Sequence, residues 1–196
     1  MQLAYTRDLV PGVPGMPFGL WNELQIVDYV AGATILPGQA VEYNTADGKI
    51  YPLKDSGTTS SFVPKLVGVA MFDPVGGENS YPPATGTNVV SFAGYVAGQP
   101  VPVCRKGKVF AIWDGGGTIA EWVQPNVNHS SDGTHDQGTF TFTAAQTTAG
   151  NEIDVCPSVL AVHKEFSGTF TDGFNQSIKV LVVELNLPSF GSTGAL

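Results

Sequence analysis

One stretch of the chain decides its fold class: Ile178-Lys179-Val180-Leu181-Val182-Val183-Glu184-Leu185-Asn186-Leu187. Successive side chains of a β-strand point to opposite faces of its sheet. The unbroken apolar run at 180–183 therefore places apolar groups on both faces, which is typical of a strand covered on both sides. We expect residues 178–187 to form a central strand.

Shorter apolar segments, separated by turn residues, occur through the rest of the chain. Asp47-Gly48 lies between two alternating runs and predicts a hairpin, because Asp and Gly tolerate the positive φ of a tight primed turn. The other expected strands are residues 24–30, 66–72, 89–96, 139–143 and 159–162. We also expect 101–103 and 109–113 to pair with each other across a turn at 105–108, with Pro102 at a sheet edge because proline lacks an N–H.

Composition supports an all-β chain. Its 24 Gly and 14 Pro punctuate the apolar runs without a repeating period, and no segment predicts a convincing helix. We expect a compact β-barrel, a jelly-roll-like domain or a β-sandwich. Residues 24–196 would form this single β domain, with 114–151 as a long loop or hairpin insertion.

Residues 1–23 are expected to form an extended N-terminal arm. Pro11, Pro14 and Pro17 prevent a helix and remove ladder donors. Such a segment buries little by itself, so we expect it to be mobile or loosely packed in the isolated protein and ordered mainly by a surface it lies against. Its apolar side chains are our candidates for binding another subunit: Leu9, Val10, Val13, Met16, Phe18 and Trp21.

Charge argues against nucleic acid as a partner. The chain has only nine Lys and Arg and a net charge of −8, whereas phosphate binding needs clustered cations. We interpret Arg105, Lys106 and Lys108 as a solvated turn. No apolar run approaches the roughly 20 residues that a spanning helix needs, so no membrane partner is expected. No apolar signal segment lies in residues 1–8, which favours synthesis and folding in a cytosol.

The two cysteines, Cys104 and Cys156, are expected to act as small buried hydrophobes. In a cytosolic chain two cysteines carry little information about pairing, so a disulfide between them stays open. A different cluster, His129, Asp132, His135 and Asp136, offers metal-ligand types within a short loop. We interpret it as a polar turn and predict no metal and no cofactor.

Catalytic signatures are missing from the sequence. It contains neither a G-x-S-x-G elbow nor a phosphate-binding glycine loop, so we predict no catalytic residues and no enzyme activity. Among the aromatics, Trp113 is expected in the core and His163, at a strand end, to be structural. Trp21 is the better candidate for an interface anchor.

The order of soft motifs resembles that of a known family. Gly15-Met16-Pro17-Phe18-Gly19 in the arm is followed by Ile35-Leu36-Pro37-Gly38-Gln39-Ala40-Val41 and by Asp47-Gly48-Lys49-Ile50. Then come Phe62-Val63-Pro64-Lys65-Leu66-Val67-Gly68-Val69-Ala70-Met71 and Tyr95-Val96-Ala97-Gly98-Gln99-Pro100-Val101-Pro102-Val103. This arrangement resembles the structural cement proteins that decorate tailed-phage capsids, over most of residues 12–113 and more loosely in the last strand.

The resemblance implies a structural protein of the virion that binds the outer capsid surface and stabilises the lattice of the major capsid protein. It also implies self-association, as a trimer or alternatively a dimer. The loop at 124–151 does not match the family pattern. Two other hypotheses stay open: a carbohydrate-binding or adhesion module using Trp122 and Tyr81, which predicts a groove lined by aromatics, and a hydrolase on a β scaffold, which predicts a pocket of titratable groups.

Overall fold

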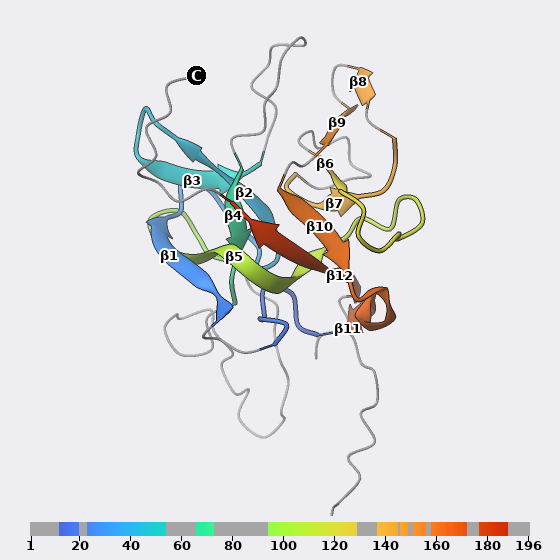
Figure 1. Ribbon diagram of the computed structural model, residues 1–196. Helices are drawn as coiled ribbons and strands as arrows, with labels where there is room; N and C mark the ends of the chain where they lie inside the picture. Colours follow the sequence, from blue (N-terminus) through green and yellow to red (C-terminus); the bar gives the residue numbers. More distant parts are fainter. Residues whose placement is uncertain are drawn as a thin grey trace, which may run out of the picture.

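The computed structural model describes residues 12–19, 23–53, 66–72, 94–128, 137–144, 146–148, 151–155, 158–171 and 177–187 (Figure 1). Its larger sheet has eight antiparallel strands: β1 (Gln25–Val30), β2 (Ala40–Asn44), β3 (Lys49–Pro52), β4 (Leu66–Ala70), β5 (Pro100–Ile112), β10 (Val159–Val162), β11 (Gly168–Thr171) and β12 (Ser177–Asn186). Their order is β10-β12-β5-β4-β2-β3, with β1 beside β5 and β11 beside β12. The all-β prediction is confirmed. Within the described residues the end strands β10 and β3 do not pair, so the barrel alternative is not supported.

The smaller sheet comes from the second half of the chain. It contains β6 (Asn126–Asn128), β7 (Phe140–Thr141), β8 (Gln146–Thr148) and β9 (Asn151–Val155), in the order β7-β6-β9-β8. The expected insertion at 114–151 therefore contributes three of these strands. A short 3-10 turn, η2 (Lys164–Phe166), follows β10.

Strand β12 occupies the central position predicted for it. It pairs with β5 along one edge and with β10 and β11 along the other. Val180, Leu181, Val182 and Val183 are all fully buried. Leu181 and Val183 join the main core, while Val180 and Val182 join a second apolar cluster on the opposite face. The unbroken apolar run thus reflects a strand covered on both sides.

Strand β5 lies inside the larger sheet and pairs with β1, β4 and β12. The hairpin predicted across a turn at residues 105–108 is wrong. Residues 101–103 and 109–113 do not pair with each other; one strand of 13 residues runs through both. Gly107 has a φ of +112°, and the register against β1 skips one residue at Arg105. An extra residue of this kind is a β-bulge, which breaks the alternation of side chains without reversing the chain. The polar residues at 105–108 therefore belong to a bulge within β5 and not to a turn.

Pro102 lies inside the sheet and not at the edge predicted for it. It faces β1 on one side, while its carbonyl accepts the Met71 N–H at 2.7 Å on the other. In an antiparallel pair of this type the two residues exchange both hydrogen bonds, but proline has no N–H to give. The buried Tyr95 hydroxyl instead donates to the Met71 carbonyl at 2.7 Å. The tyrosine replaces the missing donor and makes an internal proline tolerable.

The hairpin predicted at Asp47-Gly48 is present, with a longer turn than expected. Asn44 pairs with Lys49, so the loop spans residues 45–48. Gly48 alone in this loop has a positive φ, +71°. The Asn44 and Asp47 side chains accept backbone N–H groups two residues further on. These side-chain turns take the place of a two-residue primed turn.

A buried polar cluster joins the two sheets. Asp114, just after β5, accepts a hydrogen bond from Asn128 Nδ2 at 2.9 Å, and the same nitrogen lies 3.0 Å from Thr139 Oγ1. Asn128 is 1% exposed, so its amide depends on these partners. Val127 and Phe140 of the smaller sheet are fully buried in the main core. The smaller sheet therefore packs against the larger one.

Candidate subunit-binding surface

Residues 12–19 of the expected arm lie along one edge of β5. The Gly15 N–H donates to the Phe110 carbonyl at 2.7 Å, and the Phe18 N–H donates to the Lys108 carbonyl at 2.9 Å. Met16 completes the ladder by accepting the Phe110 N–H at 2.9 Å. The same edge of β5 pairs with β4 further back. Residues 12–19 thus pair with the part of this β5 edge that lies beyond β4. The expectation that the arm is loosely packed is wrong for these residues.

Side chains reinforce this docking. Phe18 stacks on His163 with ring centroids 4.7 Å apart, and meets Phe110 and Phe166 edge-on at 5.7 and 5.0 Å. Met16 packs into the same cluster. Aromatic pairs at these spacings stabilise beyond their buried area. His163 therefore has the structural role expected of it.

The glycines of this segment allow the close approach. A Cβ at Gly12 would overlap the Phe110 ring, and one at Gly15, whose φ is +80°, would lie 2.6 Å from the Phe72 nitrogen. The Gly/Pro spacing suggested a segment without structure of its own. In the folded chain the same glycines permit the close approach of this backbone to Phe110 and Phe72.

The candidate residues of the arm divide into two groups. Val13, Met16 and Phe18 are half-buried against their own domain. Leu9, Val10 and Trp21 lie outside the described residues.

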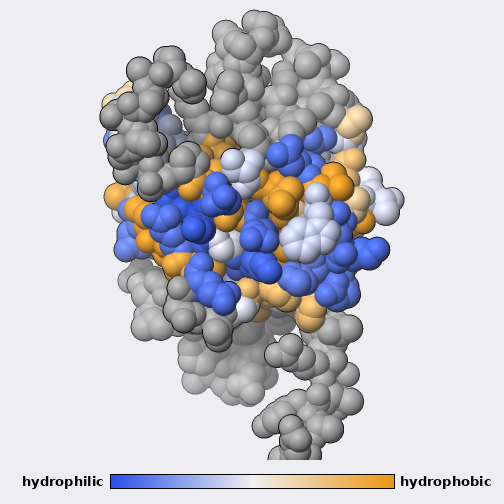
Figure 2. Space-filling view, viewed as in Figure 1, coloured by the Kyte–Doolittle hydropathy of each residue, from blue (hydrophilic) through white to orange (hydrophobic). Residues whose placement is uncertain are grey.

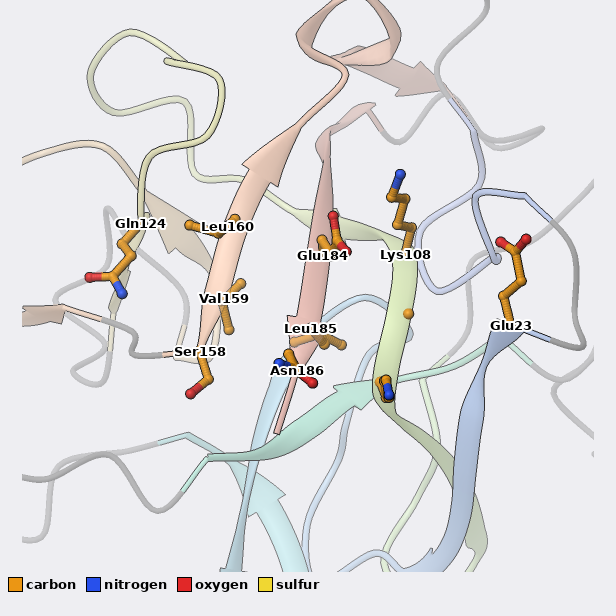
Figure 3. A pocket seen from close by; sticks show the side chains of 11 residues that line it. Glu23, Lys108, Gln124, Ser158, Val159, Leu160, Glu184, Leu185 and Asn186 are labelled. Carbon is orange, nitrogen blue, oxygen red and sulfur yellow. The ribbon is translucent and has the colours of Figure 1, made fainter. Parts of the chain in front are cut away.

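A shallow hollow of about 580 Å³ opens on the sheet face beyond the docked segment. Across it, in order, lie the loop at Gln124, then β10, β12 and β5, and finally Glu23, as Figure 3 shows. The residues that line it are Glu23, Lys106, Gly107, Lys108, Gln124, Ser158, Val159, Leu160, Glu184, Leu185 and Asn186. None is aromatic, so this hollow is not the aromatic-lined groove that sugar binding predicts.

Opposite charges stand side by side at the centre of the hollow. Lys108 of β5 and Glu184 of β12 are directly opposite each other in the strand register. The Lys108 ammonium lies 3.3 Å from His163 Nε2 and makes no ion pair with Glu184. Glu184 is half-buried and has no cationic partner among the described residues. A second cation, Lys106, is exposed beside it.

One group of exposed apolar side chains comes directly before Gln124 of the hollow in the chain. Trp122 is 62% exposed and Val123 is 45% exposed, two residues and one residue before Gln124. The Trp122 N–H donates to the Ala161 carbonyl at 2.7 Å, which ties the loop to β10. A second group, Ile26, Val30 and Val96, lies on and near β1. Figure 2 shows apolar and polar side chains interleaved over one face of the molecule.

The remaining sequence candidates are placed as follows. Trp113 is half-buried against the main core, as predicted, with its indole N–H on the Gly116 carbonyl at 3.1 Å. Cys104 is buried in that core and unpaired, and burial raises the pKa of its thiol to about 12. Arg105 is buried, contrary to the solvated turn expected for it.

Tyr81, Cys156 and the cluster of His129, Asp132, His135 and Asp136 lie outside the described residues. Of the strand expected at 89–96 only residues 94–96 are described, and among these Tyr95 makes an isolated bridge to Ile35 and no strand. Within the described part of the chain, no group of three or more His, Cys, Asp or Glu side chains could hold a metal ion. No helix among these residues is long and apolar enough to cross a membrane.

Sequence reasoning missed the hollow. Its lining comes from five separate segments of the chain, and only the folded structure brings them together. One signal in the sequence could have indicated the hollow: a charged residue next to apolar residues in each of two strands, Glu184 in β12 and Lys108 in β5. Charged residues on buried strands mark the part of a sheet face that no element covers.

These features define a class of protein: an all-β domain whose surface holds a shallow hollow lined by both polar and apolar side chains. The comparisons with known proteins agree. The model of the family described as structural cement protein (E217 gp24/Pam3 gp6) matches residues 1–179. The chain therefore belongs to the phage structural cement protein family, and its place is in the virion, on the capsid.

A solved structure has a similar fold. A chain in "The capsid of Myoviridae Phage XM1" superposes with a TM-score of 0.57 over 95% of this chain and 97% of that chain, at 14% sequence identity. At this identity the likeness concerns the fold. No curated protein matches the chain.

Proposed function

We propose that this cement protein binds the outer surface of the capsid through its arm and stabilises the lattice of the major capsid protein without catalysing a reaction. The observation that carries the proposal is the docking of residues 12–19 on β5. Val13, Met16 and Phe18 anchor the arm to its own domain. Leu9, Val10 and Trp21, on either side of this anchor, contact the capsid subunit.

A short apolar arm is a weak ligand by itself. Burying a large apolar side chain contributes about 1.5–3 kcal/mol, whereas ordering each backbone residue costs about 1–2 kcal/mol. An arm that is already fixed at 12–19 avoids part of this ordering cost. Repetition over a symmetric lattice raises the effective concentration of each further contact. Self-association, as the homotrimer implied by the family resemblance or as a dimer, adds to that effect.

The test compares two truncations with the full chain. A protein that starts at Gly12 keeps the anchor, so we expect it to fold with nearly unchanged stability and to lose most of its binding to undecorated capsids. A protein that starts at Asn22 loses the anchor as well, and should also melt at a lower temperature. Binding is measured by co-sedimentation with capsids, and reinforcement by capsid heat resistance. Full binding by the protein that starts at Gly12 would exclude Leu9 and Val10 as capsid contacts.

A further inference from the structure

The described residues with strained backbone gather around one surface. Trp122, Ser158 and His163 are the non-glycine residues in this part of the chain with positive φ, at 61°, 63° and 53°. Ser158 lines the hollow, His163 contacts Lys108 in it, and Trp122 is two residues from Gln124 on its rim. Such conformations cost about 1–3 kcal/mol each and cluster where a protein binds or switches. The strain therefore points to the face formed by the hollow and the Trp122 loop.

We infer that this face, made of the hollow together with Trp122 and Val123, is a two-fold contact between two copies of this chain. The inference rests on the self-association proposed above and identifies its surface. Binding of the arm to the capsid does not depend on it.

The charges of this face allow two copies of the same face to pair with each other. Consider two copies packed face to face about a two-fold axis that runs along the strands, between β5 and β12. Lys108 of one copy then faces Glu184 of the partner subunit, and Glu184 faces the partner's Lys108. The same operation places Lys106 against the partner's Asn186, because these two residues also stand opposite each other in the register. The half-buried Glu184 gains the cation that it lacks in a single copy.

The shape of the face fits the same axis. Gln124 forms one rim of the hollow and Glu23 forms the other (Figure 3). The exposed Trp122 and Val123 come directly before Gln124 in the chain. The two-fold rotation carries the Trp122 loop of each copy to the Glu23 side of its partner. Tryptophan is enriched among interface hot spots, and the exposed Trp122 is the large aromatic side chain that this face offers in its described part.

A projection and a hollow on one face also favour a dimer over a trimer. In a two-fold contact the same patch serves both copies, whereas a ring of three needs two different patches on each copy. The net charge of −8 makes copies repel at long range, so local charge matching decides the orientation.

The test is sedimentation velocity of the purified full chain over a range of concentrations. We expect a dimer whose dissociation constant rises at least about 30-fold in Trp122→Ala. Lys108→Glu and Glu184→Lys should each give monomers, because like charges then meet across the contact. An equimolar mixture of these two variants should form a heterodimer, because one chain then carries two carboxylates at these positions and the other carries two ammonium groups. Val96→Ala, which removes an exposed apolar group elsewhere, is the matched control and should leave the dimer intact.

The mixture keeps the test decisive if a single substitution disturbs folding, since rescue on mixing requires two folded chains. A wild-type protein that stays monomeric at all concentrations overturns the inference. So does a trimer, or a dimer that neither Trp122→Ala nor the charge reversals weaken. Variants that are folded, as judged by their circular dichroism spectra, and stay monomeric before and after mixing also contradict it. If the wild type is monomeric and Trp122→Ala loses capsid binding, the face belongs to the capsid contact instead.

Discussion

Replacing Phe18 by alanine tests whether the arm segment is part of the folded domain. The ring of Phe18 touches three other aromatic rings, from β5, from the end of β10 and from η2. Truncation of a fully buried phenylalanine costs about 3–5 kcal/mol. Phe18 is half-buried, so about 2 kcal/mol is expected. For a chain of this length each kcal/mol lowers the melting temperature by about 2–4 °C, which gives a decrease of about 4–8 °C.

The assay is thermal unfolding followed by far-ultraviolet circular dichroism. Phe18→Leu keeps most of the apolar contact and should lose less than half as much stability. Val96→Ala, at a side chain that is 50% exposed, serves as the surface control and should change the melting temperature by less than about 2 °C. A Phe18→Ala protein that melts within about 1 °C of the wild type, the scatter expected for a surface site, would show that residues 12–19 are not docked in solution.

Three further predictions concern the domain itself. Gly138→Ala should lower the free energy of unfolding by about 3 kcal/mol, because the φ of Gly138 is +75° and a Cβ would lie 2.5 Å from a backbone oxygen. Gly98→Ala, at a φ of +92° in open space, is the control and should cost only about 1 kcal/mol in the same denaturant titration. Asn128→Ala should cost about 2–3 kcal/mol by removing the hydrogen bonds that its buried amide donates to Asp114 and Thr139, whereas Gln25→Ala at an exposed site should change the unfolding midpoint little. Burial holds the pKa of the Cys104 thiol at about 12 against 9.0 for the ordinary group, so folding stability should fall as pH rises from 9 towards 12, where only the unfolded chain loses the proton. At pH 8 this thiol should react with a thiol reagent only on unfolding, measured with the other cysteine replaced by serine, and rapid labelling of the native protein would contradict its burial.

Local patterns in the sequence were sufficient to predict elements whose structure depends on their own residues or on one kind of surroundings throughout. Strand β12 is apolar on both faces because both faces are covered, and the run at 180–183 reports this directly. The hairpin at 45–48 follows from turn residues that act on their own backbone. Cys104 is buried as expected because it lies within an apolar strand.

Elements that depend on distant partners were not predictable in the same way. The stretch at 105–108 has the composition of a turn, and only the partners on both edges of β5 make it a bulge in a continuous strand. The glycines at 12 and 15 are typical of flexible chain, yet their packing depends on Phe110 and Phe72. The hollow similarly requires β10, β12 and β5 to be assembled before its charges meet.

The position of residues 12–19 on β5 also has a consequence for the order of folding. This segment leaves the ribosome long before β5, and the ring that stacks on Phe18 belongs to His163, later still. Every contact that fixes the segment is therefore non-local, and chains dominated by such contacts fold slowly. During synthesis the segment has no edge to pair with until β5 is made, and its aromatic contact with His163 forms later still. The residues that anchor the arm are thus among the first to be synthesised and the last to be locked in place.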